Sequence, residues 1–262
     1  MTARRGKVWF VGAGPGAADL ITLRGARVLG EADVVVWARS LVMEEVLAHV
    51  RPGAEVIASD DRTLEDVRAV YERAAAEGLV VARVHSGDPA IYGAIQEQIR
   101  VCGELGLDFE IVPGVSAVAA AAAALGQELT IPEGSQSLIL TRRATRTPMP
   151  ANERVAAFAR HGTTMVLFLS VGRPRELQAE LLEGGYAPDT PCAVVYRATW
   201  PDELTIRCRL DELAARIREA GVTRQALVLV GPALVDTGRR SHLYDPAHGH
   251  LFRRRSRDDA AA

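Results

Sequence analysis

Short runs of β-branched and apolar residues alternate with amphipathic stretches of helix length, and this alternation constrains the fold more than any other feature of the chain. The strands expected in the first half are 7–12, 34–37, 55–58, 79–85 and 109–112. The helices expected between them are 20–31, 42–49, 63–77 and 91–105. A repeated strand–helix order is typical of a mostly parallel sheet that is covered by helices.

Particular residues mark the ends of several of these helices. Asp19 is expected to cap the helix over 20–31, and Thr63 followed by Asp66 is close to a capping box. Gly78 and Gly106 are expected to end the two helices that precede them.

A second cycle follows an alanine-rich helix and indicates a second α/β domain. Its expected strands are 137–141, 163–170, 192–196, 204–208 and 226–231. Its expected helices are 152–160, 174–183 and 211–220. Residues 126–134 look like a passage between domains. We expect an N-terminal domain over 1–115, a C-terminal domain over 116–240 and a tail over 241–262.

Composition excludes several classes of protein. The chain has 262 residues, of which 48% are hydrophobic and 24% charged, and its net charge is −2, so it is globular and carries no charge excess for binding nucleic acid or a membrane surface. Lys7 is its only lysine, which argues against a Schiff-base enzyme and a Walker A nucleotidase. No apolar span reaches the roughly 18 residues of a membrane helix.

The cysteines and histidines predict neither disulfides nor a metal site. Cys102, Cys192 and Cys208 are too few and too scattered for a disulfide framework, so we expect a reduced, cytoplasmic protein. His248 and His250 lack an obvious third ligand, and we expect no metal.

Three glycine-bearing segments each follow an expected strand and precede a helix. Residues 12–17 match the G-x-G-x-x-G/A pattern of dinucleotide-binding folds, but the next strand ends without the acidic residue that binds a ribose. Arg39 at that position is suited to a 2′-phosphate, so an oxidoreductase using nicotinamide or flavin remains an alternative. Residues 86–93 and 113–117 repeat the arrangement, and we expect one ligand to lie across these loops at the carboxyl edge of the sheet.

An arginine cluster follows the first strand of the second cycle. Arg142, Arg143 and Arg146 are suited to bidentate contacts with carboxylates or phosphates, although a solvated surface would explain them equally well.

In order and spacing, several of these segments resemble the tetrapyrrole methylases, a family that uses S-adenosylmethionine. The segments that carry the resemblance are 11–22 (with VGAGPG), 86–93 (SGDPAIYG) and 112–117 (VPGVSA). Further segments narrow it to members of the family that act in cobalamin synthesis, and these are 37–42, 129–133, 140–150 and 241–246.

The resemblance implies a dimer of two-domain α/β chains, with a mixed C-terminal sheet and an active site in the interdomain cleft. It also implies S-adenosylmethionine as cofactor, S-adenosylhomocysteine as product and a tetrapyrrole as substrate. The positions that match cofactor contacts of the family are Pro15, Ser86, Gly87, Asp88, Ile91, Ser116, Ala117, Leu169, Tyr196, Ala198 and Ala226. The chain departs from the family at Ala17-Ala18, where relatives often have Asp-Pro, and at Leu169, where they have methionine.

A tetrapyrrole with many carboxylates gives Arg142, Arg143 and Arg146 a partner. Methyl transfer to an electron-rich carbon needs no side-chain nucleophile. The candidates for a base that removes a proton are Asp88, Tyr92 and Glu133, and the sequence does not distinguish among them. Two competing interpretations stay open, namely a relative that acts at another ring position or on RNA or diphthamide, and a binding module without catalysis.

Overall fold

The computed structural model describes residues 6–132, 134–145, 147–235, 238, 249 and 251. Contacts divide them into two compact units, of which the first contains the described residues up to Leu125 together with Val195–Leu204. The boundary therefore lies ten residues after the one expected from the sequence, and the connection between two later strands groups with the first unit. Gly114 donates to Asp88 and Ser116 lies beside Gly87, so the start of the alanine-rich helix is held to the first unit.

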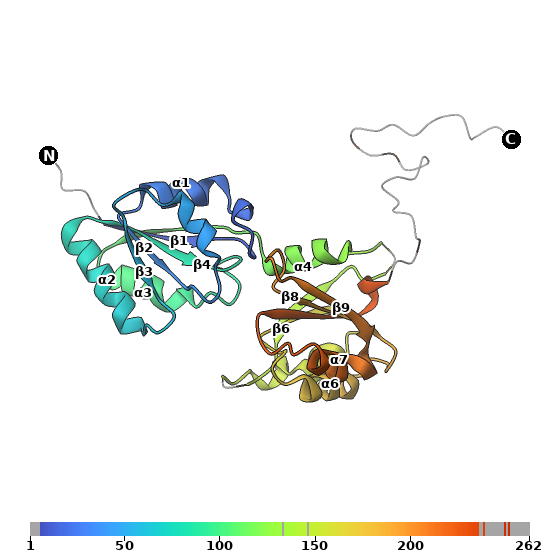
Figure 1. Cartoon of the computed structure of the whole chain (residues 1–262). Helices are drawn as coiled ribbons and strands as arrows, with labels where there is room; N and C mark the ends of the chain where they lie inside the picture. Colours follow the sequence, from blue (N-terminus) through green and yellow to red (C-terminus); the bar gives the residue numbers. More distant parts are fainter. Residues whose placement is uncertain are drawn as a thin grey trace. The chain divides into compact units, whose positions relative to one another are not determined.

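The first unit is built on a five-stranded sheet of order β3-β2-β4-β1-β5 (Figure 1). All the pairings recorded for it are parallel, with Val8 opposite Val81 and Phe109. The prediction of a mostly parallel N-terminal sheet is thus confirmed. Its strands are β1 (Lys7–Gly12), β2 (Val34–Trp37), β3 (Glu55–Ala58), β4 (Val80–His85) and β5 (Asp108–Val112).

Helices cover both faces of this sheet. On one face α1 (Leu23–Glu31) packs Val28 and Leu29 against the strands. On the other face lie α2 (Leu64–Glu77) and α3 (Ile95–Glu104). The alanine-rich α4 (Ala117–Leu125) follows β5, and two 3₁₀ segments, η1 (Ala18–Leu20) and η2 (Glu44–His49), flank α1 and β2.

Three helix expectations in this unit need correction. Asp19 lies in η1, and Thr22 caps α1 instead by accepting the Gly25 N–H at 3.0 Å. The helix expected over 91–105 begins only at Ile95, because the residues before it include two with positive φ. The helix expected over 42–49 is the 3₁₀ segment η2.

The second unit contains a five-stranded sheet of order β6-β7-β10-β8-β9. β7 pairs parallel with β6 and antiparallel with β10, which confirms the expected mixed sheet. Its strands are β6 (Leu138–Arg142), β7 (Thr164–Phe168), β8 (Pro191–Tyr196), β9 (Leu204–Arg209) and β10 (Ala226–Val230). Its helices are α5 (Val155–Ala159), α6 (Pro174–Glu183) and α7 (Leu213–Glu219), with 3₁₀ segments η3 (Ala151–Glu153), η4 (Leu210–Glu212) and η5 (Pro232–Leu234).

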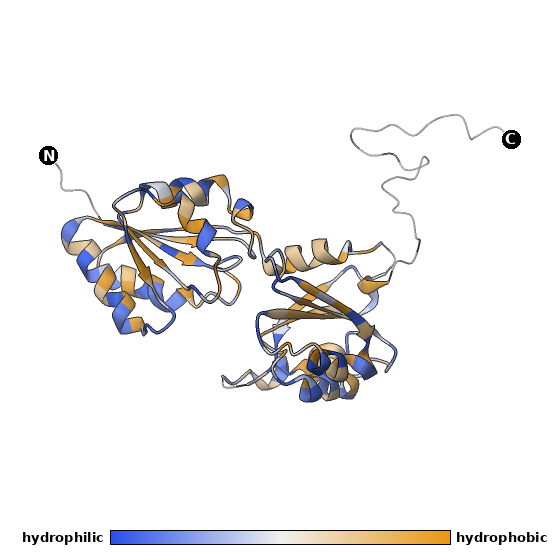
Figure 2. Cartoon of the chain, viewed as in Figure 1, coloured by the Kyte–Doolittle hydropathy of each residue, from blue (hydrophilic) through white to orange (hydrophobic). Residues whose placement is uncertain are grey.

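Each sheet forms the apolar centre of its unit. Figure 2 shows hydrophobic strands, an α4 that is hydrophobic all round, and other helices of mixed character. Every residue of β2 and β10 is buried. Cys102 and Cys192 are buried and Cys208 is half-buried, all as free thiols. Within the described part of the chain, no helix has the length and apolar character needed to cross a bilayer.

The capping box of α2 gives the first prediction. Thr63 Oγ1 accepts the Asp66 N–H at 3.3 Å, and Asp66 Oδ2 accepts the Thr63 N–H at 2.8 Å. Replacement Thr63→Ala removes one acceptor, so the free energy of unfolding in urea should fall by about 1 kcal/mol. Thr63→Ser retains the acceptor and should stay near wild type, and equal losses in both variants would contradict the cap.

A glycine-lined candidate cofactor site

The first two glycine segments are joined by their backbones. The N–H of Gly87 donates to the carbonyl of Gly14 at 2.7 Å, and the N–H of Gly14 donates to that of Gly87 at 3.3 Å. The Ala13 N–H also donates to the carbonyl of His85 at 2.8 Å. The loops after β1 and β4 are therefore joined by an isolated antiparallel bridge just beyond the parallel pairing of the two strands.

The third segment packs directly on the other two, and only glycine fits there. A Cβ on Gly12 would lie 2.5 Å from the Gly114 Cα, and one on Gly114 would lie 2.0 Å from the carbonyl oxygen of Gly87. Both distances lie far inside van der Waals contact and involve backbone atoms, which have little freedom to move. The expectation that these loops lie together at the carboxyl edge of the sheet is confirmed.

Asp88 ties the second and third segments together. One carboxylate oxygen accepts the Ala90 N–H at 2.8 Å, and the other accepts the Gly114 N–H at 2.9 Å. The first bond closes a local turn and the second crosses to the next strand exit. Both oxygens of this half-buried side chain therefore hold the loops in place.

Gly87 lies directly beside the start of α4. Gly87 has φ +63°, and a Cβ there would lie at an ordinary contact distance, 3.6 Å from the Ala117 nitrogen. Ser116 caps this helix, since its Oγ accepts the Val118 N–H at 3.2 Å. A side chain at position 87 would therefore lie against Ser116 and Ala117, two of the positions at which the resemblance predicts cofactor contacts.

The β8–β9 connection closes on the first segment within the same compact unit. Trp200 Nε1 donates to the Pro15 carbonyl at 3.1 Å, and Thr199 Oγ1 accepts the Ala17 N–H at 2.9 Å. A Cβ on Gly16 would lie 2.4 Å from the Trp200 ring, so Gly16 is required by this contact. The sequence analysis missed both Thr199 and Trp200, and the one signal available was their position directly after Ala198.

Backbone strain gathers at the positions that match cofactor contacts. Each non-glycine residue with positive φ in the described chain lies at such a position or within three residues of one. These residues are Tyr92 (+57°), Ala94 (+49°), Leu169 (+50°), Arg197 (+47°), Thr199 (+68°) and Gln225 (+53°). Such conformations cost about 1–3 kcal/mol each and concentrate at functional sites.

The positions matched to cofactor contacts differ widely in exposure. Leu169, at the end of β7, combines positive φ with a side chain that is 68% exposed. Ser86 is also exposed, and half-buried positions are Asp88, Ile91, Ser116, Ala117 and Tyr196. Pro15, Gly87, Ala198 and Ala226 are buried.

His85 lies just before the second segment and is neutral. Burial, helped by the nearby Arg83 guanidinium, lowers the pKa of His85 to about 3. Its Nε2 has no hydrogen-bond partner among the described residues. The His85 side chain is uncharged at neutral pH and adds no positive charge to the site. The residue contributes to the loops through its backbone carbonyl.

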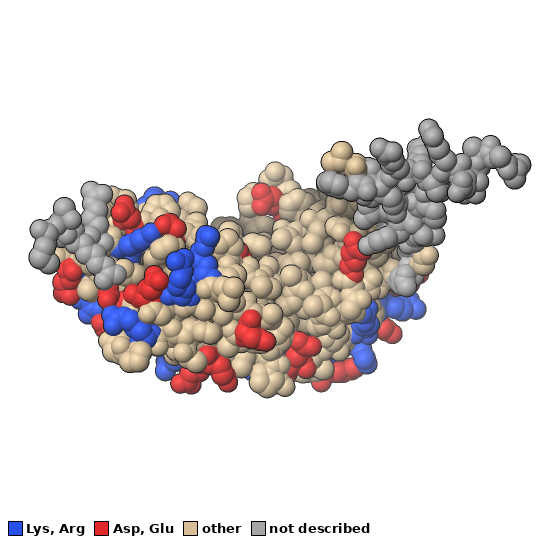
Figure 3. All heavy atoms as spheres, turned by 90° about the horizontal axis from the view of Figure 1, so that it is seen from above, with Lys and Arg blue, Asp and Glu red and all other residues tan. Residues whose placement is uncertain are grey.

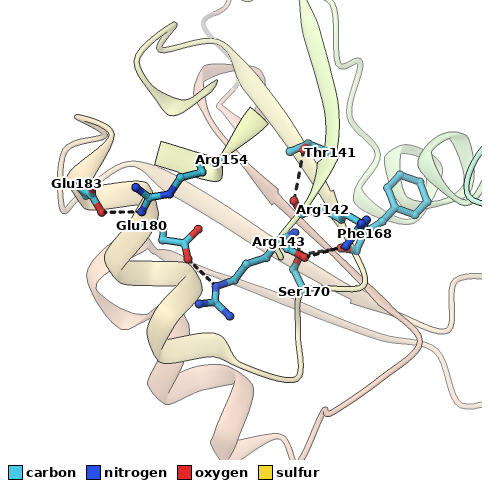
Figure 4. A network of polar contacts seen from close by, with 8 residues as sticks. All are labelled: Thr141, Arg142, Arg143, Arg154, Phe168, Ser170, Glu180 and Glu183. Atoms are coloured by element: carbon cyan, nitrogen blue, oxygen red, sulfur yellow. Dashed lines mark hydrogen bonds and ion pairs between the residues drawn. The ribbon is translucent and has the colours of Figure 1, made fainter. Parts of the chain in front are cut away.

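Arg142 and Arg143, the two members of the arginine cluster that the structure describes, make internal contacts (Figure 4). The Arg142 guanidinium donates to the backbone carbonyls of Arg143, Thr147 and Pro148 at 2.9–3.4 Å. Arg143 pairs with Glu180 of α6 at 2.7 Å, and both side chains are mostly buried. Arg143 thus anchors the strand exit to α6, while Arg142 shapes the loop that follows.

Several predicted residues lie outside the described residues. They are Glu133, Arg146, His248, His250 and segment 241–246. Among the residues that are described, no group of three or more His, Cys, Asp or Glu side chains could hold a metal ion.

The sequence and the fold match one family. The model of the tetrapyrrole (corrin/porphyrin) methylases matches residues 7–214. The chain is 44% identical to a cobalt-precorrin-4 C(11)-methyltransferase of Priestia megaterium over 95% of this chain and 98% of the relative. It is 47% identical to a precorrin-4 C(11)-methyltransferase of Mycobacterium tuberculosis over 92% of this chain and 98% of the relative.

Solved structures agree with this assignment. A cobalt precorrin-4 methyltransferase superposes with a TM-score of 0.85 at 45% identity, covering 88% of this chain and 96% of that one. A uroporphyrin-III C-methyltransferase of Thermus thermophilus, complexed with S-adenosylhomocysteine, gives a TM-score of 0.72 at 32% identity, covering 86% of this chain and 92% of that one. This chain belongs to the tetrapyrrole (corrin/porphyrin) methylases.

Proposed function

We propose that this chain transfers a methyl group from S-adenosylmethionine to carbon 11 of precorrin-4 or of its cobalt-bearing counterpart, and releases S-adenosylhomocysteine. The observation that carries the proposal is the convergence of three glycine-bearing strand exits at one edge of the sheet, beside the start of α4. Relatives that are 44–47% identical over nearly their whole length, named for this reaction, support the same substrate.

The chemistry of this reaction fits a site made mainly of backbone. When bound, S-adenosylmethionine supplies an electrophilic methyl group, and the electron-rich tetrapyrrole carbon is the nucleophile. The chain is left to align the two molecules and to exclude water, which together account for a large part of such rate enhancements. Gly87, Ser116 and Ala117 would hold the donor in this scheme.

The polar side chains take separate roles in this proposal. Asp88 positions the loops, since both of its oxygens accept backbone N–H groups. Tyr92 and Glu133 remain the candidates for removing a proton. Arg142 and Arg146 would bind substrate carboxylates. Arg143 would instead anchor the strand exit that carries them, through its ion pair with Glu180 of α6. A homodimer in the cytoplasm completes the proposal.

The competing functions lack comparable support. Arg39, the candidate for a 2′-phosphate, pairs with Asp60 at 3.3 Å, and the Ser40 N–H donates to the same carboxylate. The hydrogen bonds from Ser40 and Arg39 hold the pKa of Asp60 below its ordinary value, so the side chain that was the candidate for a 2′-phosphate is paired with a charged carboxylate of the same chain. On the face seen in Figure 3, described basic and acidic residues are interspersed, without the broad basic field expected for RNA.

Methyl transfer itself is the direct test. The purified chain should convert precorrin-4, or its cobalt form, to a product heavier by one CH₂ when S-adenosylmethionine is present, and NMR should locate the new methyl group at carbon 11. Methylation at another carbon would make the chain a different member of the family. Binding without any methylated product would favour a non-catalytic module.

Gly87→Val tests the cofactor site. Valine would extend over Ser116 and Ala117, so stabilisation by S-adenosylhomocysteine, a few kcal/mol at roughly 100-fold excess over Kd, should disappear while the chain stays folded. Gly106→Val is the matched control, because Gly106 has a similar φ of +66° with nothing within 4 Å of its Cβ. Thermal unfolding with S-adenosylhomocysteine or NADPH measures the effect. Retained stabilisation in Gly87→Val, or stabilisation of the wild type by NADPH alone, would contradict the assignment.

Arg142→Ala tests the substrate side. Removing this guanidinium should weaken tetrapyrrole binding by roughly tenfold, the effect of one charge-assisted contact, and leave affinity for S-adenosylhomocysteine nearly unchanged. Arg154→Ala controls for the loss of a positive charge, because the exposed Arg154 pairs with Glu183 at 3.8 Å (Figure 4). The measurement is a titration of each variant with the tetrapyrrole and with S-adenosylhomocysteine. If the affinity for both ligands falls equally, Arg142 is not part of the substrate site.

A further inference from the structure

Thr199 has a backbone conformation that its own side chain disfavours. Its φ is +68°, a region where a β-branched residue is a genuine outlier and where glycine or asparagine is far more common. The strain persists only if surrounding contacts fix this conformation. The contacts of Thr199 therefore indicate why a threonine stands here.

Two hydrogen bonds fix Thr199 from both sides. Its N–H donates to Glu203 Oε2 at 2.6 Å, which holds the turn of its own segment. Its Oγ1 accepts the Ala17 N–H at 2.9 Å, across 182 residues of chain. Glycine would remove the strain but has no hydroxyl. Threonine at this position accepts the strain and supplies the hydroxyl that contacts the first glycine segment.

Trp200 makes the neighbouring contacts with the same segment. Its indole N–H donates to the Pro15 carbonyl, and its ring occupies the space that a Cβ on Gly16 would need. The Arg197 guanidinium lies 4.4 Å from the centre of the Trp200 ring and pairs with Asp202 at 2.6 Å. The ring is thus held in place by a cation as well as by its indole bond.

We propose that Thr199 and Trp200 are positioning residues, which hold residues 15–17 in the conformation that receives the cofactor. They contact three consecutive residues of the first segment, and the Gly14–Gly87 bonds join that segment to the second. The inference rests on the proposed function and adds two side chains to it, the Thr199 hydroxyl and the Trp200 indole, which hold residues 15–17 from the β8–β9 connection.

A series at Thr199 separates positioning from stability. Thr199→Val and Thr199→Gly lose the hydroxyl, so Kd for S-adenosylhomocysteine and KM for S-adenosylmethionine should rise roughly five- to tenfold, as for one neutral hydrogen bond. Saturating cofactor should restore kcat. Thr199→Gly also relieves the positive φ, so its free energy of unfolding should equal or exceed that of Thr199→Val while its affinity is equally poor. Thr199→Ser keeps the hydroxyl and should rescue the affinity.

A double-mutant cycle tests Trp200. Gly16→Ala alone should weaken binding, because its Cβ would lie 2.4 Å from the Trp200 ring and 2.7 Å from the Thr199 hydroxyl. Trp200→Ala removes the contact with the ring and leaves the contact with the hydroxyl, so the two substitutions together should cost less than the sum of their separate effects. Calorimetric Kd values for S-adenosylhomocysteine and urea unfolding are measured for all four proteins. Additive effects would overturn the role of Trp200.

The outcomes distinguish this inference from the function on which it rests. If the wild type binds S-adenosylhomocysteine and Thr199→Gly binds it equally well, only the inference is wrong. If affinity across the series follows the free energy of unfolding, Thr199 is merely structural and the inference is again wrong. If the wild type does not bind the ligand, both the inference and the proposed function are overturned.

Discussion

The close approach of three backbones, at Gly12, Gly87 and Gly114, is the contact on which the rest of the candidate site depends. The parallel register of β1, β4 and β5 brings their carboxyl ends to one edge, and the loops then pack without room for a Cβ at two of the three positions. A larger residue at position 12 or 114 would separate the loops and break the Asp88 bond to the Gly114 N–H. The sheet order and the glycines therefore act together, because neither alone places the three loops in contact.

Strain is concentrated around this contact and at strand exits of both units. Leu169 and Thr199 adopt positive φ although neither side chain favours it, and Leu169 is also largely exposed to solvent. Such positions lower the stability of the fold, whereas the fully buried strands β2 and β10 are closely packed and stabilise their sheets. The structure is thus locally regular where it packs its core and locally strained at the positions where the resemblance predicts cofactor contacts.

The sequence predicted most strands and the three glycine loops, because β-branched runs and strand-to-helix glycines are local signals. Local signals also explain the errors. Asp19 and Thr22 are both good caps, and only the tertiary fold selects Thr22. The late start of α3 depends on positive φ at Tyr92 and Ala94, which residue type does not reveal. Contacts across long separations were invisible, as for Thr199 with Ala17 at 182 residues and Arg143 with Glu180 at 37 residues.

Several polar side chains near the site are either engaged in hydrogen bonds or held uncharged by burial, and this bears on the kind of reaction that the site suits. Asp88 uses both oxygens on backbone N–H groups, Thr199 uses its hydroxyl on the first loop, and burial holds His85 neutral. Side chains engaged in this way are poorly suited to act as nucleophiles, because attack on a substrate would break the bonds that shape the site. A reaction whose electrophile and nucleophile both arrive with the bound molecules avoids this conflict. Methyl transfer from a sulfonium donor to an electron-rich carbon is such a reaction, so the rigidity of these loops is itself an argument for the proposed chemistry.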